Sequence, residues 1–110
     1  MQIASSAPTR IDLAGGTIDI WPLYLFHEGA STLNAAINLR AHASINDRAD
    51  GFVEVISIDS DRKVRARTWA QFDASGDLPL LSALARHYRL ENATLSTRGD
   101  SPAGAGIAGS

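Results

Sequence analysis

Apolar and polar residues alternate along two neighbouring stretches of the chain, which is the period of half-buried β-strands. In the segment 39–46, the apolar side chains occupy every second position. Turn-forming residues follow at 47–51, and the segment 52–58 is rich in β-branched residues. Two strand-like runs joined by a short turn segment are typical of a β-hairpin. We therefore predict a hairpin made of 39–46 and 52–58.

Three further segments have strand character. The segment 63–69 alternates with three cations on one face, which is typical of an exposed edge strand. The segment 93–97 is a further strand candidate before a glycine-rich stretch. Near the N-terminus, Ile11 and Leu13 flank a polar residue in a short strand-like run that should break at Gly15–Gly16.

One segment has the period of a helix. Asp77 is a candidate N-cap, Pro79 falls in the first turn, and Asn92 could end the helix in the left-handed conformation. The residues at helical spacing are Leu80, Leu81, Leu84 and Tyr88. Because strands dominate and one helix stands apart from them, the predicted class is α+β.

Composition narrows the possible functions. The chain has 110 residues, 10 basic against 12 acidic side chains and no cysteine. This length suits one domain, and the charge balance provides no broad cationic surface for nucleic acid. Disulfides and thiolate metal sites are excluded. Without a signal peptide or an apolar run long enough for a membrane helix, we expect a cytoplasmic protein whose partner is a small molecule or another protein.

The segment 100–110 is unusually rich in glycine and alanine. Small residues let backbone N–H groups approach a bulky anion, and the hydroxyl of Ser110 could contact a phosphate or its metal ion. Three interpretations are open at this point. The segment could be a flexible tail, a phosphate-binding loop, or a dinucleotide fingerprint, since Gly104, Gly106 and Gly109 have the G-x-G-x-x-G spacing. The fingerprint requires an apolar strand that runs directly into its first glycine, whereas the residues here are polar.

The segment 7–19 favours one of these interpretations, because both segments together resemble the GHMP kinases, a family of small-molecule kinases. The sugar-kinase branch of that family begins with a run like A-P-G-R-V-N-L-I-G-E-H-T-D. The matching positions are Ala7, Pro8, Arg10, Leu13, Gly15 and Asp19. The segment 33–38 resembles the family's L-P-x-A-I run. The family's phosphate motif P-x-x-x-G-L-x-S-S is matched by Pro102, Gly106, Ile107 and Ser110.

The resemblance implies a fold, a domain and a reaction. The fold is the ribosomal-protein-S5-domain-2-like N-terminal domain of a GHMP kinase, cut before the helix of the phosphate loop. Residues 1–110 would be part of the ATP-binding domain, with the C-terminal domain absent. The reaction is transfer of the γ-phosphoryl group of ATP, with Mg²⁺, to a hydroxyl of a sugar or sugar phosphate. The fragment alone should be inactive, since the family's catalytic base lies downstream.

The resemblance also implies residue roles. Arg10 would act at the transferred phosphoryl group, where a permanent cation suits the developing charge. Asp19 would accept hydrogen bonds from sugar hydroxyls, next to Gly15 and Gly16. The ATP phosphates would be bound by Pro102, Gly104, Gly106, Ile107, Gly109 and Ser110, the last also contacting Mg²⁺.

One departure from the family pattern affects the substrate. Gly16–Thr17 stands where galactokinases have Glu-His, which is closer to the heptose-phosphate and fucose kinase branch. Two alternatives to a kinase stay open: a non-catalytic binding or interaction domain with the same fold, and a dinucleotide-binding module that uses Gly104–Gly109. Neither the acceptor nor the oligomeric state follows from the sequence.

Overall fold

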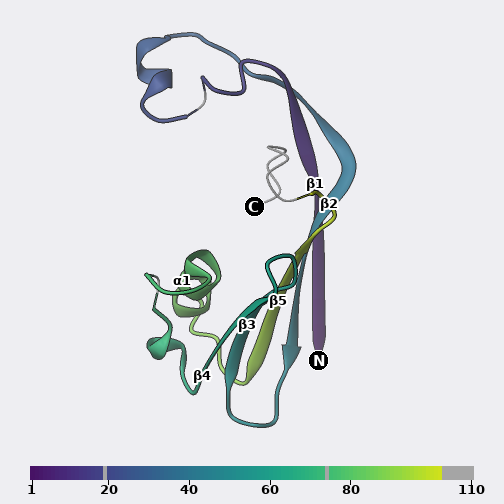
Figure 1. Ribbon diagram of the computed structural model, residues 1–110, viewed down its shortest axis with the longest axis vertical. Helices are drawn as coiled ribbons and strands as arrows, with labels where there is room; N and C mark the ends of the chain where they lie inside the picture. The colour runs from purple at the N-terminus through teal and green to yellow at the C-terminus, as the bar shows by residue number, and fades with distance from the viewer. Residues whose placement is uncertain (19, 74, 103–110) are drawn as a thin grey trace. The chain divides into compact units, whose positions relative to one another are not determined.

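The structure of the protein is a computed structural model, in which residues 1–18, 20–73 and 75–102 are described. Within these residues, five strands and one α-helix confirm the α+β class (Figure 1). The elements in chain order are β1 (Gln2–Ala14), the 3₁₀ helix η1 (Leu23–Phe26), β2 (Leu33–Asp47), β3 (Val53–Ser57), β4 (Arg62–Ala66), the 3₁₀ helix η2 (Trp69–Gln71), α1 (Pro79–His87) and β5 (Ala93–Gly99).

The strands form one sheet in the order β1-β2-β5-β3-β4. The predicted hairpin of 39–46 and 52–58 is therefore wrong: both segments are strands, but β5 lies between β2 and β3. Strand β3 pairs antiparallel with β4 and parallel with β5, so that Val55 lies opposite Val64 on one side and Leu95 on the other. Alternation identifies a strand, whereas its neighbour depends on where the later chain returns. The predicted edge strand is confirmed as β4, which ends the sheet.

The contacts divide the chain into two units. Unit 1 consists of Met1–Ser6 and His42–Gly99 and contains the hydrophobic core. In this unit, α1 packs against β3 (Figure 1), and its buried residues share the core cluster with Leu95 of β5. The buried core residues are Val53, Val55, Phe72, Leu81, Ala85 and Leu95. Their spacing follows the elements, because every second residue of a strand and every fourth residue of a helix point the same way.

Helix α1 differs from its prediction in the face that it buries. Leu81 and Ala85, one turn apart, are buried in the core, whereas Leu80 is 63% exposed and Tyr88 is 69% exposed. The leucines at 80, 84 and the tyrosine at 88 form the adjacent stripe of the helix. The sheet thus packs against only one of two neighbouring apolar stripes, and the stripe with more large apolar residues is the exposed one.

Both ends of α1 also differ in detail. Leu78, with φ of 52°, occupies the N-cap position that was predicted for Asp77, and Pro79 begins the helix as predicted. The carbonyl oxygen of Asp77 instead accepts a hydrogen bond from Ser82 Oγ at 3.3 Å. Arg89 is the first left-handed residue after the helix, with φ of 50°. Asn92 is left-handed as well, with φ of 47°, and directly precedes β5.

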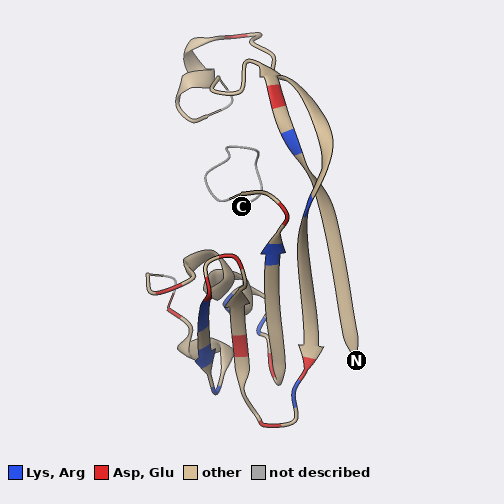
Figure 2. Ribbon diagram, turned by 45° about the vertical axis from the view of Figure 1, so that its right-hand side comes forward, with Lys and Arg blue, Asp and Glu red and all other residues tan. Residues whose placement is uncertain are grey.

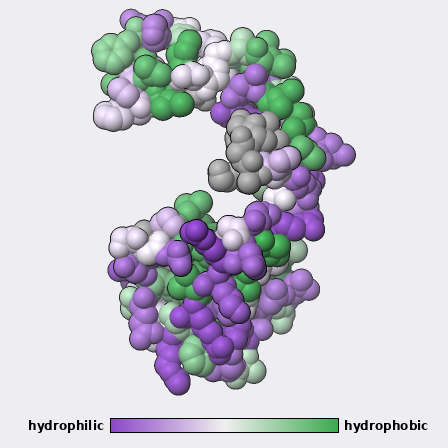
Figure 3. Space-filling model, in the orientation of Figure 1, coloured by the Kyte–Doolittle hydropathy of each residue, from purple (hydrophilic) through white to green (hydrophobic). Residues whose placement is uncertain are grey.

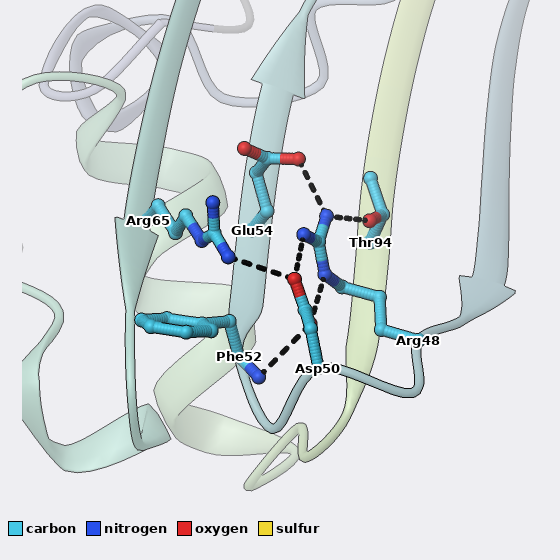
Figure 4. Close-up of polar contacts among 6 residues, drawn as sticks. All are labelled: Arg48, Asp50, Phe52, Glu54, Arg65 and Thr94. Carbon is cyan, nitrogen blue, oxygen red and sulfur yellow. Dashed lines mark hydrogen bonds and ion pairs between the residues drawn. The ribbon is translucent and has the colours of Figure 1, made fainter.

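An ion-pair network joins the segment after β2 to the strands of unit 1 (Figure 4). Arg48 Nη1 donates to Glu54 Oε2 on β3 at 2.7 Å and to Thr94 Oγ1 on β5 at 2.9 Å. The Arg48 and Glu54 side chains are 19% and 15% exposed, which makes this pair less screened by water than a surface pair. Arg48 also donates from Nε to Asp50 Oδ1 at 2.9 Å.

Asp50 accepts from three sides in this network. Besides Arg48, two further groups donate to the Asp50 carboxylate. The Phe52 backbone N–H donates at 3.2 Å, and Arg65 Nη2 on β4 donates at 2.7 Å. The guanidinium of Arg65 also stacks 3.9 Å from the centroid of the Phe52 ring. The hydrogen bonds from Arg48 and then the Phe52 backbone hold the pKa of the Asp50 carboxyl well below its usual range.

This lowered pKa predicts an acid-dependent loss of stability. A carboxyl whose pKa is lower in the folded state stabilises the fold fully above its unfolded pKa of about 4, and that contribution is lost as pH falls from there toward the folded pKa. Asp50→Asn should therefore flatten the decrease in melting temperature between pH 5 and pH 2, measured by circular dichroism. Asp61→Asn, at an exposed position of a turn outside the network, should keep the wild-type decrease. Parallel curves for wild type and Asp50→Asn would contradict the prediction.

Candidate functional site

The predicted site residues that the structure describes all lie in unit 2, which contains Ala7–Ala41 and the described residues after Gly99. Strand β1 carries Arg10 and Asp12 near its C-terminal end (Figure 2). Residues two positions apart in a strand point to the same face. Arg10 Nε lies 3.3 Å from Asp12 Oδ1, and the two side chains are 43% and 26% exposed. The structure thus places a carboxylate directly beside the predicted catalytic arginine.

Thr9 attaches this part of β1 to β2. Thr9 is only 3% exposed, and its hydroxyl donates to the Leu39 carbonyl oxygen at 2.8 Å. A buried hydroxyl needs such a partner to offset the loss of water. Because Thr9 directly precedes Arg10, this hydrogen bond fixes the backbone from which the arginine extends.

The predicted break at Gly15–Gly16 is confirmed, and the structure shows why both residues are glycine. Gly15 has φ of +78°, and a Cβ atom there would lie 2.6 Å from the Ser31 carbonyl oxygen. Thr32 Oγ1 donates to the Gly15 carbonyl oxygen at 3.0 Å and so holds the turn against the start of β2. A Cβ atom at Gly16 would lie 2.6 Å from Asp12 Oδ2. The turn therefore packs directly on the carboxylate that contacts Arg10.

Gly15→Ala should destabilise unit 2 more than a matched change elsewhere. Gly29 is the control, because its φ is +77° and a Cβ there would meet no atom within 4 Å. Gly29→Ala bears only the left-handed strain, about 1–2 kcal/mol, whereas Gly15→Ala adds the collision with backbone. Urea denaturation should give a clearly larger loss of unfolding free energy for Gly15→Ala. Equal losses in the two variants would show that the close approach at Gly15 is unimportant.

The segment before the predicted phosphate loop is attached to β2. The Asp100 backbone N–H donates to the Arg40 carbonyl oxygen at 2.8 Å, and the Arg40 backbone N–H donates to Asp100 Oδ2 at 3.2 Å. Strand β5 has ended at Gly99, and residues 100–102 are not in a strand. A dinucleotide fingerprint needs a strand running into its first glycine, so this arrangement disfavours the dinucleotide alternative.

The structure brings together Arg10, Gly15 and Gly16 and places Pro102, an exposed residue, just after the Asp100 attachment. The other predicted site residues lie outside the described residues: Asp19, Gly104, Gly106, Ile107, Gly109 and Ser110. In the described part of the chain, no three His, Cys, Asp or Glu side chains are grouped closely enough to hold a metal ion. Nor is any helix among those residues long and apolar enough to cross a membrane.

Sequence reasoning did not select Asp12, Thr9 or Asp100. A signal for Asp12 was present, because it lies two positions from Arg10 in a strand-like run and must share its face. Thr9 and Asp100 act through contacts with β2 that only the tertiary structure provides. A shallow cleft in unit 1, lined in part by His42, Ser44 and Arg98, contains none of the predicted site residues.

Unit 2 also exposes an apolar segment after the glycine turn (Figure 3). The residues are Ile20, Trp21, Leu23, Tyr24, Leu25 and Phe26, between 39% and 75% exposed. The peptide bond between Trp21 and Pro22 is cis.

Solved structures of three kinases match most of this chain. A D-glycero-D-manno-heptose 1-phosphate kinase from Bacteroides thetaiotaomicron matches with a TM-score of 0.77 and 31% identity, over 97% of this chain and 36% of its own. A protein from Campylobacter jejuni assigned as a sugar kinase matches with a TM-score of 0.73 and 22% identity, over 96% and 35%. The mevalonate kinase of Methanococcus jannaschii matches with a TM-score of 0.72 and 12% identity, over 99% and 36%.

The last two matches are below 25% identity and show the fold alone, whereas the first adds sequence similarity along nearly the whole chain. No protein-family model and no curated protein matches the chain. The chain spans about a third of the length of each of these solved relatives. The resemblance to the GHMP kinase family is therefore confirmed, and the chain has the fold of the N-terminal domain of these enzymes.

Proposed function

We propose that the chain is the nucleotide- and acceptor-binding part of an ATP-dependent kinase that phosphorylates a hydroxyl of a sugar or sugar phosphate. One observation carries this proposal. A chain 31% identical to a heptose 1-phosphate kinase over 97% of its length places Arg10, Asp12 and the Gly15–Gly16 turn side by side at the end of one strand. A guanidinium beside a tight glycine turn suits a phosphoryl group that must approach the backbone closely.

Arg10 would bind the oxygens of the transferred phosphoryl group. Its side chain is 43% exposed, and a guanidinium is a planar cation whose donors match phosphoryl oxygens. Charge on these oxygens grows in the transition state, and a cation already in place stabilises it there without reorganising. The acceptor hydroxyl would be bound next to Arg10, with Asp19 accepting its hydrogen bonds.

The nucleotide would be bound by the segment from Pro102 to Ser110. The two backbone and side-chain hydrogen bonds between Asp100 and Arg40 support this assignment, because they tie the start of that segment to the strand beside Arg10. Ser110 would contact Mg²⁺, which arrives with ATP and neutralises phosphate charge when bound. The catalytic base and the second glycine motif would correspond to the part of the solved relatives that this chain does not span.

The test is isothermal titration of the protein with ATP·Mg²⁺, followed by a transfer assay with a panel of hexoses, heptoses and their phosphates. We expect ATP·Mg²⁺ to bind. We also expect the full-length native protein to transfer phosphate from ATP to a sugar or sugar phosphate. For variants of Arg10, Arg62→Met is the matched control, since Arg62 pairs with Asp77 on the surface of unit 1. No nucleotide binding at millimolar ATP would overturn the proposal. Binding without transfer to any acceptor would instead support a non-catalytic domain of the same fold.

A further inference from the structure

Asp12 lies between two groups on one face of the β1 end. On one side its Oδ1 faces Arg10 Nε at 3.3 Å. On the other side its carboxylate packs on Gly16, where a Cβ atom would lie 2.6 Å from Oδ2, 2.7 Å from the Asp12 Cβ and 2.9 Å from its Cγ. The side chain is only 26% exposed. Space for this carboxylate thus exists because residue 16 has no side chain.

Asp12 contacts the Arg10 guanidinium at Nε, the nitrogen nearest the aliphatic part of the side chain. The Nε atom is buried and its contact with Asp12 is an ion pair without hydrogen-bond geometry, whereas the side chain as a whole is 43% exposed. A carboxylate at Nε therefore restricts rotation about the last bonds of the side chain. Arginine has many rotamers, and a held planar fork loses less freedom for each hydrogen bond that it makes to a phosphoryl group.

We propose that Asp12 is a positioning residue for phosphoryl transfer: it holds the Arg10 guanidinium in place and couples it to the Gly15–Gly16 turn. This inference rests on the proposed function of Arg10. The turn continues the coupling, because the Ile18 backbone N–H donates to the Gly15 carbonyl oxygen at 3.1 Å and closes the loop that leads toward position 19. Arg10 and the acceptor-binding turn would thereby move as one body.

The first measurement follows Arg10 itself in the chain as it stands. The Nε–Hε signal of Arg10 in a ¹H–¹⁵N spectrum is assigned by its disappearance in Arg10→Lys. In Asp12→Ala we expect this signal to shift and its exchange with water to become faster. Asp12→Asn, which keeps the shape of the side chain without its charge, should give an intermediate shift. The remaining signals of the spectrum report whether each variant is folded.

The second measurement is the steady-state kinetics of phosphoryl transfer by the full-length native protein. A misplaced arginine should lower kcat by about 10- to 100-fold in Asp12→Ala, with little change in the KM for ATP, because the loss falls on the transition state. Asp12→Asn should recover part of kcat. The matched control is Asp77→Ala, which removes an exposed ion pair of similar length, 3.4 Å to Arg62, and should leave kcat unchanged.

The outcomes separate this inference from the proposed function. An unchanged Arg10 signal in Asp12→Ala, or an unchanged kcat in an active enzyme, would overturn the positioning role. An equal loss in Asp12→Ala and Asp77→Ala would overturn it too. If the wild type transfers no phosphate at all, the proposed function fails, while the spectrum still decides whether Asp12 holds Arg10.

Discussion

Replacing Arg10 by methionine should lower kcat for phosphoryl transfer by about 100- to 1,000-fold, the effect of removing a preorganised charge from a transition state. Methionine keeps the unbranched stem and the apolar contacts, but it cannot neutralise charge on phosphoryl oxygens. The Arg10 side chain is 43% exposed, and its buried Nε forms an ion pair with Asp12. The assay is steady-state transfer from ATP to the preferred acceptor.

Arg10→Lys tests whether geometry or charge matters more. Lysine keeps the positive charge but replaces the planar fork by a single ammonium, so we expect only partial recovery over Arg10→Met. Both variants should retain the wild-type melting temperature within a few degrees, since a partly exposed ion pair contributes little to stability. If Arg10→Met keeps full kcat, Arg10 has no part in transfer and the resemblance to the family motif is misleading at this position.

Replacing Phe72 by alanine should reduce the unfolding free energy of unit 1 by about 3–5 kcal/mol, the usual cost of removing a buried aromatic side chain from a core. Phe72 is 1% exposed and belongs to the cluster that joins α1 to β3 and β5. The hydrogen bond from Arg86 Nη1 to the Phe72 carbonyl oxygen, at 3.2 Å, uses the backbone and should survive the substitution. The cost therefore reports packing alone.

Phe26→Ala is the matched control for this loss. Phe26 is the same residue type but is 75% exposed, so its removal should change the unfolding free energy by no more than about 0.5 kcal/mol. Urea unfolding followed by far-ultraviolet circular dichroism measures both variants. A similar loss in Phe26→Ala would mean that the apolar segment 20–26 contributes to the core of the folded protein, contrary to its exposure.

Local patterns predicted elements well and their partners poorly. Strand-like runs at 39–46, 52–58, 63–69 and 93–97 all fall on strands of the sheet, although β4 ends at Ala66 and is followed by η2. The period of two is a local property of a pleated chain. The insertion of β5 between β2 and β3 is not local, because it depends on a crossover through β4 and α1. The same limit explains why two apolar stripes of α1 could not be ranked before the sheet was in place.

The same distinction between local and tertiary signals applies to the candidate site. Arg10 and Gly15–Gly16 were predicted from a motif, and the structure places them together. Asp12 lies within that motif but was not selected, since its role depends on the backbone of Gly16 packing against it. Thr9 and Asp100 contact β2 across long stretches of sequence, through Leu39 and Arg40. No single-sequence pattern indicates such pairs.

The strand order has a consequence for how the chain can fold as it is synthesised. The β3–β4 pair is local and can form as soon as Ala66 is available. Strand β5, which is the central strand of the order, is also the latest in sequence among the described residues. Until β5 arrives, β2 and β3 each lack a neighbour on one side, and their open edges can pair with other chains. A nascent or pulse-labelled chain that stops before Ala93 should therefore depend on chaperones, whereas release from them should follow the addition of Gly99.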